Sequence, residues 1–139
     1  TAVREGNVEA VYREWARRAA DELGRHGGLY MHLKGPDEPG HDGNAATKRD
    51  IIALIDRAFF GELLPHIDLR QVLIAVTADH ATPCGLKAHS DDPVPLLVAG
   101  DGVKPDGTRR YGEREAASGD LGVLAGVDVM PLLAGLAQA

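Results

Sequence analysis

Two groups of carboxylates and imidazoles in this sequence have residue types and spacing suited to metal ions. Asp37 and His41 are four residues apart, Asp79 and His80 are adjacent, and one more imidazole follows at His89. This mixed set of nitrogen and oxygen ligands suits Zn²⁺ or Mn²⁺ better than it suits Ca²⁺. Because five such side chains can surround two divalent ions, the pattern indicates metal-assisted phosphate chemistry.

The first group follows a short apolar run. Residues 29–33, Leu-Tyr-Met-His-Leu, predict a buried strand in which His32 is a hydrogen-bonded core histidine rather than a ligand. Residues 34–44 hold two prolines and three glycines among the polar side chains. We therefore expect an irregular loop at the carboxyl end of the strand, where open α/β sheets place their ligands. The alternative for this loop is a solvated acidic turn.

The second group follows a β-branched apolar run. Residues 72–76 predict a central parallel strand, and an ionisable pair directly after a buried strand is costly unless it has a partner. Asp79 and His80 would face opposite ways on a regular strand, so we expect the backbone to turn there. A further strand is expected over 94–98, where Pro95 favours an edge position.

Helical patterns account for most of the remaining chain. Apolar spacing predicts one amphipathic helix over 7–24 and a second from about 44 to 64, with Pro65 as its stop. Lys48 on the second helix is expected to be an ordinary solvated or capping charge, with contact to an anion near the loop as the alternative. A last helix is expected to begin near Asp128, with Pro131 in its first turn. Strands alternating with helices predict an α/β fold with a mainly parallel sheet.

Composition limits the class of protein. The 139 residues are 44% hydrophobic, which predicts one domain with a core. The net charge of −6 and the lack of a basic, aromatic block argue against nucleic-acid or anionic-membrane partners. The single cysteine, Cys84, excludes an intramolecular disulfide. No apolar run approaches the roughly 20 residues needed to cross a bilayer, so we expect a soluble, cytoplasmic protein.

Several segments taken together resemble one known family. They are Lys-Gly-Pro-Asp-Glu-Pro-Gly-His-Asp-Gly over 34–43, Thr-Ala-Asp-His-Ala-Thr-Pro-Cys over 77–84, His-Ser-Asp-Asp-Pro-Val-Pro over 89–95, and 48–56, 111–122 and 126–133. In these segments the chain resembles the archaeal-type, 2,3-bisphosphoglycerate-independent phosphoglycerate mutases of the alkaline phosphatase superfamily. The resemblance implies a partial alkaline-phosphatase-like α/β fold, mainly parallel sheet flanked by helices.

The resemblance also implies a ligand set. Asp37, His41 and His89 would bind a first divalent ion, and Asp79 and His80 would bind a second. Mn²⁺ is the expected ion, with Mg²⁺, Zn²⁺ or Co²⁺ as alternatives. In the family, an aspartate near the N-terminus and the serine that becomes phosphorylated complete the second site.

Neither of those two segments is found in this sequence. The resemblance therefore implies that residues 1–139 are the C-terminal part of a metal-binding catalytic domain, without the nucleophile-bearing N-terminal part and the inserted domain. Ser90 and Ser118 do not have the sequence context of the nucleophile. We thus assign no catalytic residue in this chain, and the residues that contact substrate are not identified.

For the full-length protein the resemblance implies an isomerase of glycolysis and gluconeogenesis. It would interconvert 3-phosphoglycerate and 2-phosphoglycerate through a phosphoserine, while this chain alone would be inactive. Its partners would be a phosphoglycerate and the N-terminal part of the same protein. A metal-dependent phosphatase or phosphodiesterase of the same superfamily is one alternative. The other is a catalytically silent interaction fragment, whose exposed sheet edge could form a homo-oligomer.

Overall fold

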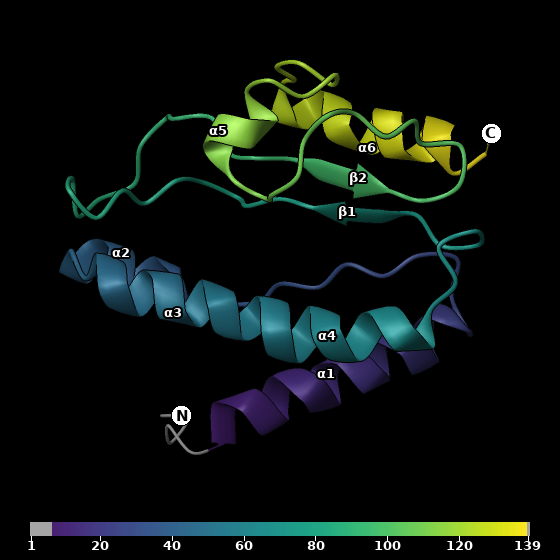
Figure 1. The fold of residues 1–139 in the computed structure, drawn as a ribbon, viewed down its shortest axis with the longest axis horizontal. Coiled ribbons are helices and arrows are strands. Elements are labelled where there is room, and N and C mark those ends of the chain that lie inside the picture. The colour runs from purple at the N-terminus through teal and green to yellow at the C-terminus, as the bar shows by residue number, and fades with distance from the viewer. Residues whose placement is uncertain (1–6, 139) are drawn as a thin grey trace. The chain divides into compact units, whose positions relative to one another are not determined.

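A computed structural model of the chain describes residues 7–138 and divides into two compact units (Figure 1). Unit 1 comprises the residues up to 67 together with 82–89, and unit 2 comprises 68–81 together with the residues from 90 onward. Across the described range 7–138, no helix has the length and apolar character required to traverse a lipid bilayer.

Unit 1 is helical. Its elements are α1 (Val8–Leu23), α2 (Asp37–Asp42), α3 (Ala45–Ile55), the π-helical turn η2 (Asp56–Phe60), α4 (Gly61–Leu63) and the 3₁₀ turn η3 (Leu64–His66). The predicted second helix is confirmed, because α3, η2, α4 and η3 follow one another without a break. Asn44 caps it by accepting a hydrogen bond at 3.0 Å from the Thr47 backbone N–H, and Pro65 lies in its last turn.

A small core holds α1 against the second helical segment. Tyr12, Ala16 and Ala19 recur at helical spacing and form the buried face of α1. They pack against a buried set on η2 and α4, namely Ala58, Phe59 and Leu63. The alanines of this core are small, so α1 and η2 can approach closely beside the rings of Tyr12 and Phe59. The predicted helix over 7–24 is therefore confirmed, although the side chain of Asn7 forms no capping hydrogen bond.

The predicted buried strand over 29–33 is wrong. The segment is not part of a sheet, and the side chains of Leu29 and Tyr30 are 42% and 86% exposed. His32 is exposed as well, so it is not a core histidine. A strand needs a neighbour to pair its backbone groups, and the described residues of this chain provide none beside it.

Within its described residues, unit 2 contains two short strands and two helices. Strand β1 (Ile74–Val76) pairs antiparallel with β2 (Leu97–Ala99), with Ala75 opposite Val98. The predicted mainly parallel sheet is therefore not confirmed. The apolar run over 72–76 suits a strand of either direction, and residues 77–96 contain no crossover helix of the kind that a parallel connection requires.

The helices of unit 2 are α5 (Glu113–Ala116) and α6 (Gly126–Leu136). Helix α6 begins earlier than predicted, because the Asp128 N–H already donates to the carbonyl of Ala125 at 2.9 Å. Pro131 consequently lies inside the helix rather than in its first turn. The expectation that Pro131 lies in the first turn of this helix is wrong.

Candidate metal centre

A short helix places the first two predicted ligands on one face. Asp37 and His41 lie in α2, where the sequence predicted an irregular loop. Residues four apart are neighbours on a helix surface, and His41 Nε2 is 3.5 Å from Asp37 Oδ1. Pro39 is tolerated because it lies in the first turn, and Gly43 ends the helix with a φ of 75°. Helical geometry, rather than loop irregularity, therefore brings the pair together.

His89 supplies the third side chain from the segment 82–89. Its Nε2 lies 3.1 Å from His41 Nε2 and 3.7 Å from Asp37 Oδ1. The candidate ligand atoms of the three residues all lie within 4.8 Å of one another. All three side chains are about half exposed, so solvent and ions can reach them. The structure thus brings together the three residues predicted for the first ion.

The orientation of His41 suits a metal ligand. Its Nδ1 lies 3.2 Å from the backbone carbonyl oxygen of Lys87, which can only accept a hydrogen bond. In the neutral imidazole, Nδ1 therefore carries the proton, and Nε2 presents its lone pair to Asp37 and His89. Metal-binding histidines commonly use their second nitrogen in this way.

Lys87 has an unusual backbone conformation. Its φ is 54°, and it is the one residue other than glycine with a positive φ within 7–138. This left-handed conformation is uncommon for a side chain of this size. It occurs where the Lys87 carbonyl meets the ring of His41.

Thr82 is a neighbour of the site that sequence reasoning missed. Its side chain is only 4% exposed, and its hydroxyl donates to Asp37 Oδ1 at 2.6 Å. The Thr82 carbonyl in turn accepts a hydrogen bond at 2.7 Å from Lys48 Nζ. Lys48 was expected to lie near the loop, and it does, but its contact is with backbone. A threonine before Pro83 carries no sequence signal that separates it from an ordinary turn residue.

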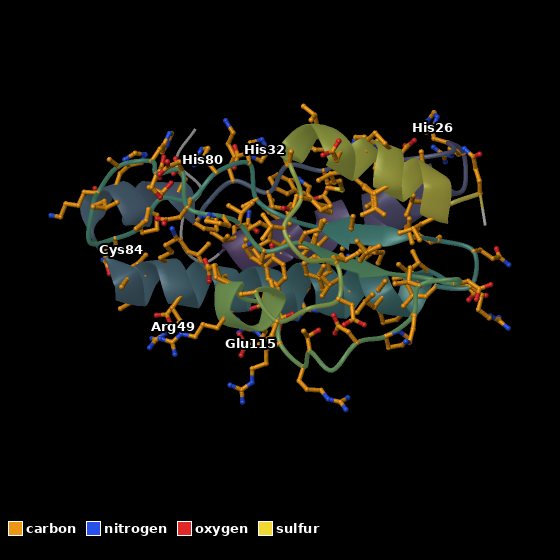
Figure 2. The ribbon with its side chains drawn as sticks, turned by 90° about the horizontal axis from the view of Figure 1, so that it is seen from above. His26, His32, Arg49, His80, Cys84 and Glu115 are labelled. Carbon is orange, nitrogen blue, oxygen red and sulfur yellow. The ribbon has the colours of Figure 1, made fainter. Side chains whose placement is uncertain are left out.

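Close packing joins α2 to the segment 82–89. A Cβ atom at Gly40 would lie 2.7 Å from the carbonyl oxygen of Thr82, so only glycine permits this approach. Figure 2 labels Cys84 on the same segment, where its Sγ lies 3.9 Å from the carbonyl oxygen of Pro39. The glycine in the Asp-Glu-Pro-Gly-His motif is therefore a packing requirement of the site.

The second predicted pair lies in unit 2. Strand β1 ends at Val76, and the chain bends at Asp79 and His80. His80 Nε2 lies 3.5 Å from Asp79 Oδ2, and the His80 N–H donates to Asp79 Oδ1 at 3.2 Å. The predicted turn is confirmed, since the two side chains face each other. Their assignment to a second ion stays a prediction.

Comparison with known proteins agrees with these features. Residues 5–135 match the sequence profile of the metalloenzyme superfamily. The chain is 45% identical over 118 residues to a 2,3-bisphosphoglycerate-independent phosphoglycerate mutase of Pyrococcus horikoshii, with 85% of this chain and 28% of the relative covered. It is 45% identical over 128 residues to a protein of the same name from Methanoculleus marisnigri, with 92% and 30% covered.

A solved structure supports the likeness in three dimensions. A protein from Pyrococcus horikoshii superposes with a TM-score of 0.85 at 44% identity, covering 88% of this chain and 37% of that one. The predicted resemblance to the archaeal mutases is confirmed by these identities. The chain spans less than a third of the length of these two relatives.

Proposed function

We infer the function of this chain from its family, because the chain belongs to the metalloenzyme superfamily. We propose that Asp37, His41 and His89 hold one divalent ion and that Asp79 and His80 contribute to a second. The observation that carries the proposal is the convergence of the first three ligand atoms within 4.8 Å. The tautomer set by the Lys87 carbonyl supports it, since it leaves the metal-binding lone pair of His41 directed at the cluster.

We further propose that the whole protein interconverts 3-phosphoglycerate and 2-phosphoglycerate. The names of the relatives and their 45% identity support this activity. Bound divalent ions would neutralise charge on the transferring phosphoryl group and activate the attacking oxygen. The contribution of this chain is to hold those ions: two imidazoles and one carboxylate form a nitrogen and oxygen donor set that suits Mn²⁺ or Zn²⁺.

The test is a mutase assay on the full-length polypeptide that contains this chain. Metal-free protein should convert no 3-phosphoglycerate, Mn²⁺ should restore the activity, and His41→Ala should abolish it. The 139-residue chain by itself should show negligible turnover. Turnover by the metal-free protein would refute the proposal. Release of inorganic phosphate in place of 2-phosphoglycerate would identify a phosphatase instead.

A further inference from the structure

We propose that Thr82 is a positioning residue for the metal centre, and that Lys48 holds Thr82 in place. The inference rests on the proposed metal site at Asp37, His41 and His89. It concerns different residues, since the proposed ligand set is Asp37, His41 and His89. The function of the threonine would be to fix the direction in which the Asp37 carboxylate faces.

Thr82 donates its hydrogen bond to the Asp37 oxygen that also lies near both histidines. Its 2.6 Å length is typical of a hydroxyl bound to a charged carboxylate. The acceptor, Asp37 Oδ1, is also the oxygen found 3.5 Å from His41 Nε2 and 3.7 Å from His89 Nε2. A carboxylate has about four lone-pair positions, so this bond leaves acceptor capacity for an ion. The hydroxyl therefore restricts the rotation of a half-exposed side chain without occupying the site.

Thr82 is itself held rigidly. Its side chain is 4% exposed, and its carbonyl accepts the charged Lys48 ammonium at 2.7 Å. Helix α2 packs against it at Gly40, where a Cβ would lie 2.9 Å from Thr82 Cγ2. A chain of contacts thus runs from α3 through Lys48 and Thr82 to the carboxylate of Asp37. A partner that orients a metal ligand typically contributes 10- to 100-fold to metal affinity.

The test is a titration of the metal-free chain with Co²⁺ alone, followed by visible absorption, because the cobalt bands report coordination geometry. Thr82→Val keeps the shape of the side chain and removes the hydroxyl. In this variant the affinity of the tighter Co²⁺-binding event should fall by about 10- to 100-fold, and the cobalt absorption bands should change. Thr82→Ser keeps the hydroxyl and should bind within a few-fold of the unchanged chain. Thr47→Val makes the same chemical change on the exposed surface of α3 and should have no effect.

A second variant covers the case in which Thr82→Val fails to fold. Lys48→Met removes the ammonium and leaves the threonine in place, so it should reduce Co²⁺ affinity by up to about 10-fold. If the unchanged chain binds Co²⁺ and both Thr82→Val and Lys48→Met bind it equally well, the positioning role is refuted while the metal site stands. If the unchanged chain binds no Co²⁺, both the metal site and the positioning role are refuted.

Discussion

The two units differ in how their candidate ligands are supported. In unit 1, three side chains from α2 and from the segment 82–89 converge, and α2 and this segment are packed against each other through Gly40 and Thr82. In unit 2, Asp79 and His80 are adjacent in sequence and face each other after a strand of only three residues. Convergence in unit 1 depends on contacts between distant segments, whereas the unit 2 pair follows from one bend of the backbone.

The units also differ in their cores. Apart from Pro39 and Pro95, every apolar side chain that is buried within the described part of the chain belongs to α1, η2 or α4 of unit 1. The described residues of unit 2 form no such buried cluster, and Val123 and Val127 of this unit are 90% and 83% exposed. A site that needs fixed geometry is better supported where side chains are closely packed. We therefore expect unit 1 to be more sensitive to substitution than unit 2.

The largest expected effect is on the core of unit 1. Phe59 is 4% exposed and packs among Tyr12, Ala16 and Leu63, so Phe59→Ala should lower the free energy of unfolding by about 3–5 kcal/mol. Leu69 in unit 2 is 39% exposed, and Leu69→Ala should cost less than about 1 kcal/mol. Urea denaturation followed by circular dichroism measures both. Equal losses in the two variants would show that the two units do not differ in packing.

The next largest effect separates the two metal sites. His89→Ala removes one of the three proposed ligands, so the affinity of the first Mn²⁺ should fall by more than about 100-fold, which is more than the loss of a supporting contact would cause. The second Mn²⁺ should keep its affinity, because its proposed ligands in this chain are Asp79 and His80. Isothermal titration calorimetry distinguishes the two events, and Asp79→Asn provides the reciprocal control. Equal weakening of both events by His89→Ala would contradict the assignment.

A smaller effect tests the packing that creates the first site. Gly40→Ala would place a Cβ 2.7 Å from the Thr82 carbonyl, so α2 must shift at a cost of about 1–3 kcal/mol, and Mn²⁺ affinity should fall with it. Gly85→Ala is the matched control, since a Cβ there meets no atom within 4 Å. Thermal unfolding and Mn²⁺ titration measure the two consequences. If the two alanine variants behave alike, the contact between α2 and Thr82 is not what forms the site.

The candidate ligands could be chosen from the sequence more readily than the structure that holds them. Residue type and resemblance selected Asp37, His41 and His89, whose ligand atoms the fold brings within 4.8 Å of one another, and apolar spacing predicted the two long helices. The helix α2 was missed because proline and glycine usually interrupt helices. Here Pro39 occupies the first turn, where its missing N–H costs nothing, and Gly43 ends the helix. The spacing of Pro39 and Gly43, a proline in the first turn and a glycine just after the last, was the sequence feature that could have predicted this helix.

Other features had no local signal at all. The apolar run over 29–33 has a strand-like composition, but a strand also needs a neighbour, and composition cannot supply one. Pairing direction in the β1 and β2 sheet likewise depends on the path of residues 77–96. The hydrogen bond from Thr82 to Asp37 joins residues 45 positions apart, and it becomes visible only when the fold brings them together.

The smallest expected effect concerns the pKa of a tyrosine, and each unit has one tyrosine whose pKa is raised. Tyr12 is buried in unit 1 and donates its hydroxyl to the Lys34 carbonyl at 3.1 Å, and burial raises its pKa. In unit 2 the Tyr111 hydroxyl donates to the Pro95 carbonyl at 3.3 Å, and burial together with the nearby charge of Glu113 raises the pKa of Tyr111 to about 12.

A raised tyrosine pKa means that the folded chain holds the phenol proton more tightly than the unfolded chain does. The stabilisation from Tyr111 is therefore fully present below its ordinary pKa of 10.0, and it is lost as the pH rises through about 12. Tyrosinate absorbance should show a phase near pH 12 that is reduced by one tyrosine in Tyr111→Phe and unchanged in Tyr30→Phe, whose ring is 86% exposed. If that phase is absent from the unchanged chain, the contact with Pro95 does not persist in solution, and unit 2 is looser than its structure shows.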